Sequence, residues 1–334
     1  MDKKITMAIN WAGACGGCDV AILDMEEMLF DIVDIADIVY WPVAMDFKRD
    51  DLIAMKNGSI DIVLFNGTVR TSEQEEDARI LRDRCKVMIA FGACSAFGGI
   101  PGLANVSDRE EIFRVSYEDT PSTVNPDGVR PQTSCHVNGD TITLPEFYDT
   151  VKTLDQVVDV DYYVPGCPPT SNTIAQAVGV IAAYAKGEDL PPRGASISSP
   201  KALCEECKRA ATKTGQRIPE VIRPHEVVAD PDRCFLEQGI LCMGPFTAGG
   251  CGGNCINANM PCRGCYGPTS KLLDPGAEAL STFGSIVGKG GEDFQLRGQM
   301  KAPVNNIKDP IGSFYRFTFP SALVNRTVKE GKNK

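Results

Sequence analysis

The sequence predicts an α/β fold, with an open parallel sheet in its N-terminal part and an irregular, cysteine-rich C-terminal part. Short apolar runs rich in β-branched residues alternate with helical patterns as far as residue 186. Strand and helix repeated in this way are typical of a parallel sheet with helices on both faces. From residue 204 to residue 265 the alternation is lost, and eight cysteines and many glycines take its place.

Five segments are predicted to be strands. Each is a short apolar run bounded by turn or helix signals, which is typical of a buried strand. They are residues 5–11, 36–43, 60–66, 87–91 and 160–164. Residues 104–150 are expected to form a long, partly irregular insertion before the last strand.

Three segments between the strands are predicted to be helices. Residues 19–34 place apolar side chains at helical spacing. Residues 72–84 open with Ser72 and Glu75, residue types that cap a helix start. Residues 171–186 are apolar and rich in alanine, and Gly187 stands where a C-terminal cap is expected.

A domain boundary is expected near residue 190. The stretch LPPRGASISSP, residues 190–200, is rich in proline, serine and glycine and has the composition of a linker. We therefore expect a first domain over residues 1–189, a linker over 190–203 and a second domain over 204–334. The irregular second domain needs cross-links from another source, because it offers little regular apolar structure to bury.

The cysteine content indicates metal or redox chemistry. The chain has 14 cysteines and only 2 histidines. It has no export signal that we recognise and no run of about 18 apolar residues, so we expect a cytoplasmic protein without a membrane span. Disulfides rarely hold such proteins together. The net charge of −10 argues against nucleic acid or an anionic membrane as a partner.

Four cysteines follow the ends of three predicted strands. Cys15 and Cys18 come after the first strand, Cys94 after the fourth and Cys167 after the fifth. The carboxyl ends of parallel strands lie at one edge of a sheet, so we expect these four thiolates to converge. Nearby glycines allow close backbone approach and amide donation to an anionic group. This pattern suits a 4Fe–4S cluster.

Other interpretations of these four cysteines stay open. A CxxC at a strand-to-helix turn is also typical of a thioredoxin-like disulfide, although that leaves Cys94 and Cys167 without a role. A zinc site accepts four cysteines, but structural zinc ligands are usually closer in sequence. Any single one of them could be a small buried side chain.

The eight C-terminal cysteines form two groups of four, and their spacing alone does not say which belongs to which. Two zinc sites remain possible from this segment taken alone. The predicted cluster in the first domain favours iron–sulfur here too, and three clusters in one chain would conduct electrons. The eight are Cys204, Cys207, Cys234, Cys242, Cys251, Cys255, Cys262 and Cys265.

A series of motifs resembles the small subunit of nickel–iron hydrogenases, in particular the cytoplasmic methyl-viologen-reducing type linked to heterodisulfide reductase. In chain order these are WAGACGGCD, GACSAFGGIPGLAN, VPGCPPTSN, QGILCMGPFTAGGCG and MPCRGCYGPT, and the ending IGSFYRFTFPSALV resembles the tail of that type. The resemblance covers nearly the whole chain. It implies a flavodoxin-like first domain and an iron–sulfur second domain.

The resemblance also implies ligands for three 4Fe–4S clusters. The proximal cluster would be held by Cys15, Cys18, Cys94 and Cys167, the medial one by Cys251, Cys255, Cys262 and Cys265, and the distal one by Cys204, Cys207, Cys234 and Cys242. Many family members have a proline in place of the fourth medial ligand and a 3Fe–4S cluster. Because this chain offers Cys255, a 4Fe–4S cluster is expected. Ala14 stands where many members carry a glutamate.

The function implied by the resemblance is electron transfer in a hydrogenase, with no catalytic residue in this chain. The nickel–iron site is expected in a large-subunit partner, and an iron–sulfur adaptor subunit and heterodisulfide reductase are expected to receive the electrons. A sulfhydrogenase or another iron–sulfur relay is the alternative, and a zinc-stabilised binding module is a third. The aromatic tail, with Phe314, Tyr315, Phe317 and Phe319, could join an interface or pack on its own domain.

Overall fold

The computed structural model describes residues 4–218, 220–287 and 307–327. Within them, the central sheet consists of five parallel strands. Their order is β2–β1–β3–β5–β9, the arrangement of flavodoxin-like doubly wound folds. The strands are β1 (Ile5–Trp11), β2 (Ala36–Tyr40), β3 (Ile60–Asn66), β5 (Cys85–Phe91) and β9 (Tyr162–Val164). The predicted fold class is therefore confirmed, with the second and fifth strands shorter than expected.

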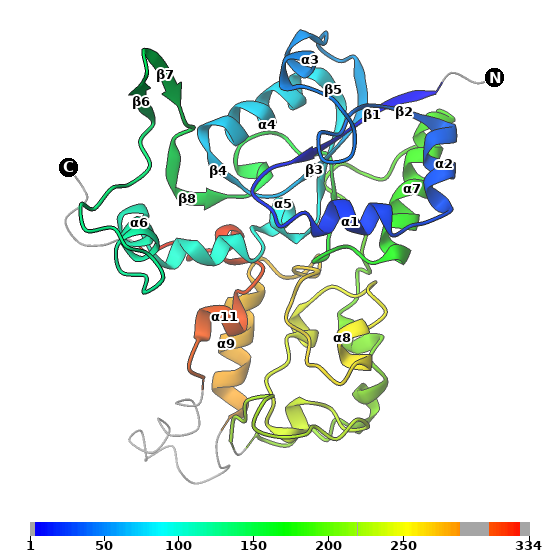
Figure 1. Cartoon of the computed structure of the whole chain (residues 1–334). Helices are drawn as coiled ribbons and strands as arrows, with labels where there is room; N and C mark the ends of the chain where they lie inside the picture. The colour runs from blue at the N-terminus through cyan, green and yellow to red at the C-terminus, as the bar shows by residue number, and fades with distance from the viewer. Residues whose placement is uncertain (1–3, 219, 288–306, 328–334) are drawn as a thin grey trace.

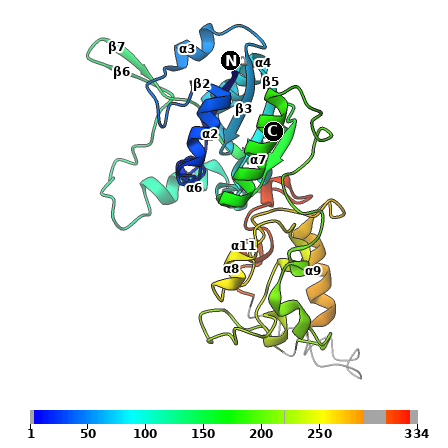
Figure 2. The ribbon, with the colours of Figure 1, turned by 90° about the vertical axis from the view of Figure 1, so that its right-hand side faces the viewer.

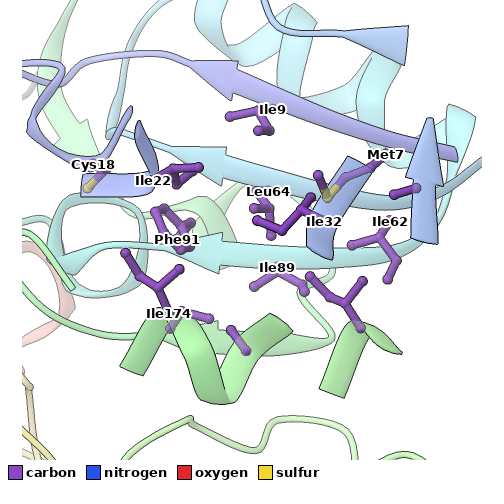
Figure 3. Close-up of a cluster of buried hydrophobic side chains, with 14 of the residues drawn as sticks. Met7, Ile9, Cys18, Ile22, Ile32, Ile62, Leu64, Ile89, Phe91 and Ile174 are labelled. Atoms are coloured by element: carbon purple, nitrogen blue, oxygen red, sulfur yellow. The ribbon is translucent and has the colours of Figure 1, made fainter. Parts of the chain in front are cut away.

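Helices cover both faces of this sheet, and each face has its own buried cluster. One face carries α1 (Gly17–Leu23), α2 (Met28–Ile35) and α7 (Ser171–Ala185), and the other carries α3 (Arg49–Ala54), α4 (Ser72–Arg84) and α5 (Ala93–Phe97). Figure 3 shows the first cluster, in which Ile9, Leu64 and Ile89 of the strands meet Ile22, Ile32 and Ile174 of the helices. Apolar burial on both faces is what parallel sheets require.

The prediction of a single helix over residues 19–34 is wrong, because a turn divides this segment into α1 and α2. Glu26 adopts a left-handed backbone conformation in that turn, with φ 51°. Met25 remains buried in the same cluster as Ile22 and Ile32. The apolar spacing therefore continues across the break, and spacing alone does not reveal it.

The insertion is more regular than its composition indicates. It contains η1 (Pro101–Val106), α6 (Arg109–Tyr117), the hairpin of β6 (Ser134–Val137) and β7 (Asp140–Thr143), and β8 (Phe147–Lys152), which pairs with β4 (Val69–Thr71). A short helix η2 (Leu154–Gln156) leads to the last strand. Part of the predicted linker extends the sheet edge, since the Tyr163 amide donates to Ala195 O at 3.0 Å and the Ile197 amide to Tyr163 O at 2.8 Å.

The second lobe lies below the sheet lobe in Figures 1 and 2. Its elements are η3 (Leu203–Glu205), η4 (Lys208–Thr212), η5 (Leu236–Gln238), η6 (Gly244–Phe246), α8 (Asn254–Asn257), α9 (Pro275–Ile286), α11 (Pro310–Phe314) and η8 (Phe319–Ser321). Most are single turns. The lobe nevertheless encloses a third buried cluster, in which Phe246, Phe283 and Phe314 pack ring against ring.

The aromatic tail packs on the protein itself. Phe314, Tyr315 and Phe319 are buried in the cluster of the second lobe, and Phe317 is half-buried. The tail also reaches the sheet lobe, because the Gly99 amide donates to Phe317 O at 3.0 Å. Among the described residues, no helix has both the length and the apolar character that a membrane crossing needs.

Candidate iron–sulfur sites

Four cysteines meet at the edge of the sheet lobe that faces the second lobe, and we call Cys15, Cys18, Cys94 and Cys167 the first set. Cys18 lies in the first turn of α1, which follows β1 after a short loop, and Cys94 lies in the first turn of α5, which begins two residues after β5. Both helices lie at that edge (Figure 1). The loops are joined by backbone hydrogen bonds, since the Ala93 amide donates to Gly166 O at 2.7 Å.

The thiols of the first set interact with one another. Burial raises the pKa of the Cys18 thiol, and the charges of Cys94, Cys167 and Cys15 raise it further. Burial and the neighbouring Cys167 and Cys15 raise the pKa of Cys94 to about 12. Thiolates repel one another in this way only when they lie close together. Residues from three remote loops therefore surround a common space, as the sequence predicts.

Glycine backbone lies directly against these sulfur atoms. A Cβ at Gly92 would sit 2.4 Å from Cys18 Sγ, and one at Gly99 would sit 2.5 Å from Cys94 Sγ. Both glycines have positive φ, which other residues rarely adopt. The Gly17 amide donates to Cys15 Sγ at 3.4 Å. Four thiols in a cradle of bare backbone fit a bulky anionic iron–sulfur group.

Four cysteines of the second lobe line one small cavity, and we call Cys204, Cys207, Cys234 and Cys242 the cavity set. Burial raises the pKa of Cys242 to about 11. The Gly244 and Cys262 amides donate hydrogen bonds to its sulfur, and these act in the opposite direction and lower the pKa. Cys204 Sγ accepts a hydrogen bond from Lys213 Nζ at 3.1 Å. These are the four cysteines that the resemblance groups as distal ligands.

The remaining four, Cys251, Cys255, Cys262 and Cys265, form the middle set. Burial raises the pKa of Cys265 to about 12, and the charges of Cys251 and Cys255 act in the same direction. Burial raises the pKa of Cys262 as well, and Cys265 contributes to that shift. The Gly253 and Asn254 amides donate to Cys251 Sγ. These are the donors that tune an iron–sulfur cluster.

The middle set touches both of the others. The Cys167 amide of the first set donates a hydrogen bond to Cys265 Sγ, and the charge of Cys167 raises the pKa of Cys265. At the other end, the charge of Cys242 raises the pKa of Cys262. Tyr266 stabilises the contact between the first and middle sets, because its buried hydroxyl forms a hydrogen bond of 2.7 Å with Thr173 Oγ1 at the start of α7. The three sets therefore form one continuous series through both lobes.

All 14 cysteines are free of disulfides. Within the described ranges, no three His, Cys, Asp or Glu side chains lie close enough together to bind a single metal ion. A cubane is larger than one ion and holds its thiolates further apart than Zn²⁺ does. Cys85 is buried at the start of β5, and Cys135 is exposed on the β6–β7 hairpin, so both lie outside the three sets.

Sequence reasoning missed three charged residues at these sites. Lys213 and Arg209 line the cavity of the cavity set, and Asp19 is buried beside Cys18. All three lie close in sequence to the cysteines, and this was the only indication of their role. Proximity in sequence does not show which side chain turns toward the sulfur atoms.

Comparisons with known proteins identify the family. Residues 15–181 match the family model described as NADH ubiquinone oxidoreductase, 20 Kd subunit. The iron–sulfur subunit of the F420-non-reducing hydrogenase of Archaeoglobus profundus is 41% identical over 97% of this chain and 99% of its own length. The chain belongs to the family of F420-non-reducing hydrogenase iron–sulfur subunits. The corresponding hydrogenase subunit of Methanothermobacter marburgensis is 36% identical over 99% of this chain and all of its own length.

The fold of this hydrogenase subunit is shared with a solved structure. It matches a chain of the [NiFeSe]-hydrogenase of Dm. baculatum with a TM-score of 0.52, over 80% of this chain and 96% of that one, at 18% identity. The resemblance predicted from the motifs is confirmed. The chain is thus the iron–sulfur, electron-transfer subunit of an F420-non-reducing hydrogenase.

Proposed function

We propose that this chain carries electrons from hydrogen oxidation through three 4Fe–4S clusters, held by the first, middle and cavity sets in that order. In this proposal a large subunit holds the nickel–iron site, and an iron–sulfur adaptor subunit and heterodisulfide reductase receive the electrons in the cytoplasm. When bound, each cluster supplies a one-electron carrier whose potential the protein adjusts.

The continuous series of interacting cysteines carries this proposal. Cys94 and Cys167 interact within the first set, Cys167 with Cys265, Cys265 with Cys262, and Cys262 with Cys242. Electron carriers must be close neighbours to exchange electrons, and a series that reaches from the sheet edge to the far lobe meets that need. Isolated structural metal sites would not require such an arrangement.

Exposed apolar side chains beside the first set support a large protein partner there. Ile100 donates its amide to Cys94 Sγ while its side chain is 45% exposed. Trp11 and Val20, on either side of the CxxC, are also about half exposed. Aromatic and aliphatic groups of this kind are typical of the core of a protein interface. A large subunit seated on this surface would cover the first set.

Cys255 supports a fourth ligand in the middle set. Its charge contributes to the raised pKa values of Cys251 and Cys265. A middle set of three cysteines would suit a 3Fe–4S cluster, whereas four thiolates suit a 4Fe–4S cluster. The expected iron content therefore depends on this residue.

Metal analysis of the intact complex, purified without oxygen, tests the proposal. Beyond the iron of the nickel–iron site and the iron and sulfide of the adaptor subunit, we expect about 12 iron atoms and about 12 acid-labile sulfides per copy of this chain, with nickel in the large subunit. Cys255→Ser should lower the iron content, and the matched change Cys135→Ser on the exposed hairpin should leave it unchanged. Zinc without iron would overturn the proposal. Sulfide formation from polysulfide by the complex would favour the sulfhydrogenase alternative.

A further inference from the structure

Two cations, Lys213 and Arg209, lie at the cavity set, and within the described ranges neither has an acidic partner. Lys213 Nζ contacts Cys204 Sγ at 3.1 Å, and it also interacts electrostatically with Cys234 and Cys242. In the part of the chain that the structure describes, no carboxylate forms an ion pair with it. Lys213 is therefore a positive charge directed at sulfur.

Arg209 is the second cation, and it is only 5% exposed. Its guanidinium donates to the carbonyl oxygens of Asp230 at 2.8 Å and Arg233 at 3.1 Å, and to Asn259 Oδ1 at 2.8 Å. It also stacks over the Phe235 ring at 4.2 Å. These partners bind both terminal nitrogens and are all neutral, and among the described residues no carboxylate forms an ion pair with Arg209. A buried cation of this kind needs a nearby negative charge, which four thiolates around the cavity would provide.

The first set has the opposite charge beside it. Asp19, next to Cys18, is 1% exposed and has no ion pair within the described residues. Its two carboxylate oxygens accept hydrogen bonds from Trp41 Nε1 at 2.9 Å and Asn66 Nδ2 at 2.8 Å. Both of these hydrogen-bond partners are neutral side chains.

The middle set has one charge of each sign. Glu206 acts on Cys251, while its Oε1 accepts from the Gly250 amide at 2.7 Å. Arg263 interacts with Cys262 and Cys242. From the first set to the cavity set, the fixed charge therefore changes from negative through mixed to positive.

We propose that these fixed charges grade the reduction potentials of the three sets, with Asp19 lowering the potential at the first set and Lys213 and Arg209 raising it at the cavity set. This inference rests on the three-cluster function proposed above. Adding an electron adds negative charge, so a neighbouring carboxylate opposes reduction and a neighbouring cation favours it.

The grading favours electron flow away from the hydrogen-oxidising partner. Oxidation of one H₂ in the large subunit releases two protons and two electrons, and each electron then passes singly from set to set. At each transfer the donor set loses one electron and the acceptor set gains one, and no bond forms or breaks in this chain. An electron carrier in a partner subunit receives the electrons from the cavity set.

Redox titration of the anoxic complex, followed by EPR, tests the cavity-set arm. At the wild-type midpoint potential of the distal signal, Lys213→Gln should lower the reduced-to-oxidised ratio about fivefold, because one partly solvated charge is lost. Lys213→Arg, which keeps the charge, should restore the ratio. The matched control is Lys208→Gln, which removes the same charge from an exposed position in η4 and should leave the ratio unchanged.

The first-set arm predicts the opposite sign. Asp19→Asn should raise the reduced-to-oxidised ratio of the proximal signal about tenfold at its wild-type midpoint, because the charge is buried. Equal behaviour of Lys213→Gln and Lys208→Gln, with iron content intact, would overturn the inference but leave the three-cluster function standing. A wild-type complex with fewer than three cluster signals would overturn both.

Discussion

The sheet lobe and the second lobe hold their cysteines by different means. In the sheet lobe, backbone pairing of β1, β3, β5 and β9 fixes the loops that carry the first set. In the second lobe, the cavity set lies among single turns, and the strand-like pairing consists of isolated bridges such as Ala202 with Ala248. We therefore expect the sheet to hold the first site in place without metal, and the second lobe to depend more strongly on its metal for stability.

Removing the iron should give the largest difference between the two lobes, measured as their amide hydrogen exchange. After anaerobic chelation, we expect amide hydrogen exchange in residues 204–267 to become at least about 100-fold faster, because the turns there have few other cross-links. Peptides from β3 and β5 should keep their protection. The measurement is hydrogen exchange by mass spectrometry before and after chelation, and equal loosening of both lobes would remove the distinction between them.

A glycine substitution should remove the proximal cluster while leaving the sheet lobe folded. Gly99→Ala places a Cβ 2.5 Å from Cys94 Sγ, so the iron held by this chain should fall by about a third. Gly58→Ala is the matched control, since Gly58 also has positive φ but meets nothing within 4 Å. Iron analysis and circular dichroism measure the two effects. Full iron in Gly99→Ala would show that this backbone does not limit the site.

Removing a hydrogen bond at the junction between the lobes should have a smaller effect on stability. Tyr266→Phe removes the hydroxyl that bonds Thr173 and Thr170, and leaves a buried threonine hydroxyl with one partner fewer. We expect a loss of about 1–2 kcal/mol, seen as faster hydrogen exchange at the start of α7. Tyr117→Phe on α6 should leave that exchange unchanged. Unaltered exchange in both variants would mean that other contacts hold the junction.

The smallest expected effect concerns the sheet lobe alone. Burial acts to raise the pKa of Asp61, but hydrogen bonds from Lys86 and Thr6 outweigh it and lower the pKa below its ordinary 3.8. Asp61→Asn should therefore cost about 1 kcal/mol at neutral pH, measured by hydrogen exchange of β3. The difference should be complete above about pH 5 and shrink as the pH falls toward and through the lowered pKa. A difference that grows in acid would contradict this sign.

The first site was predictable because each of its cysteines directly follows a strand or opens the next helix. Once the sheet is parallel, its topology brings Cys94 and Cys167 beside the CxxC. The break between α1 and α2 was not predictable, since Met25 stays buried in the turn and preserves the helical spacing.

The second lobe was less predictable for a related physical reason. Its turns have no period, so spacing does not tell which cysteines share a cavity or that Arg209 and Lys213 turn toward it. Asp19 was visible in the first motif, but its partners Trp41 and Asn66 come from segments remote in sequence. The resemblance supplied a partition of the eight cysteines that the residues alone did not.

The central claim is that the three sets form one path for electrons, and Cys94→Ser tests it most directly. The intact complex would be reduced with hydrogen and its reduced clusters counted by EPR spin quantitation. We predict three reduced clusters in the wild type besides those of the adaptor subunit. In the variant, the proximal signal should be absent, the other two should appear only with a chemical reductant, and hydrogen-dependent electron delivery should stop. A variant that retains every signal and full delivery from hydrogen would contradict the account.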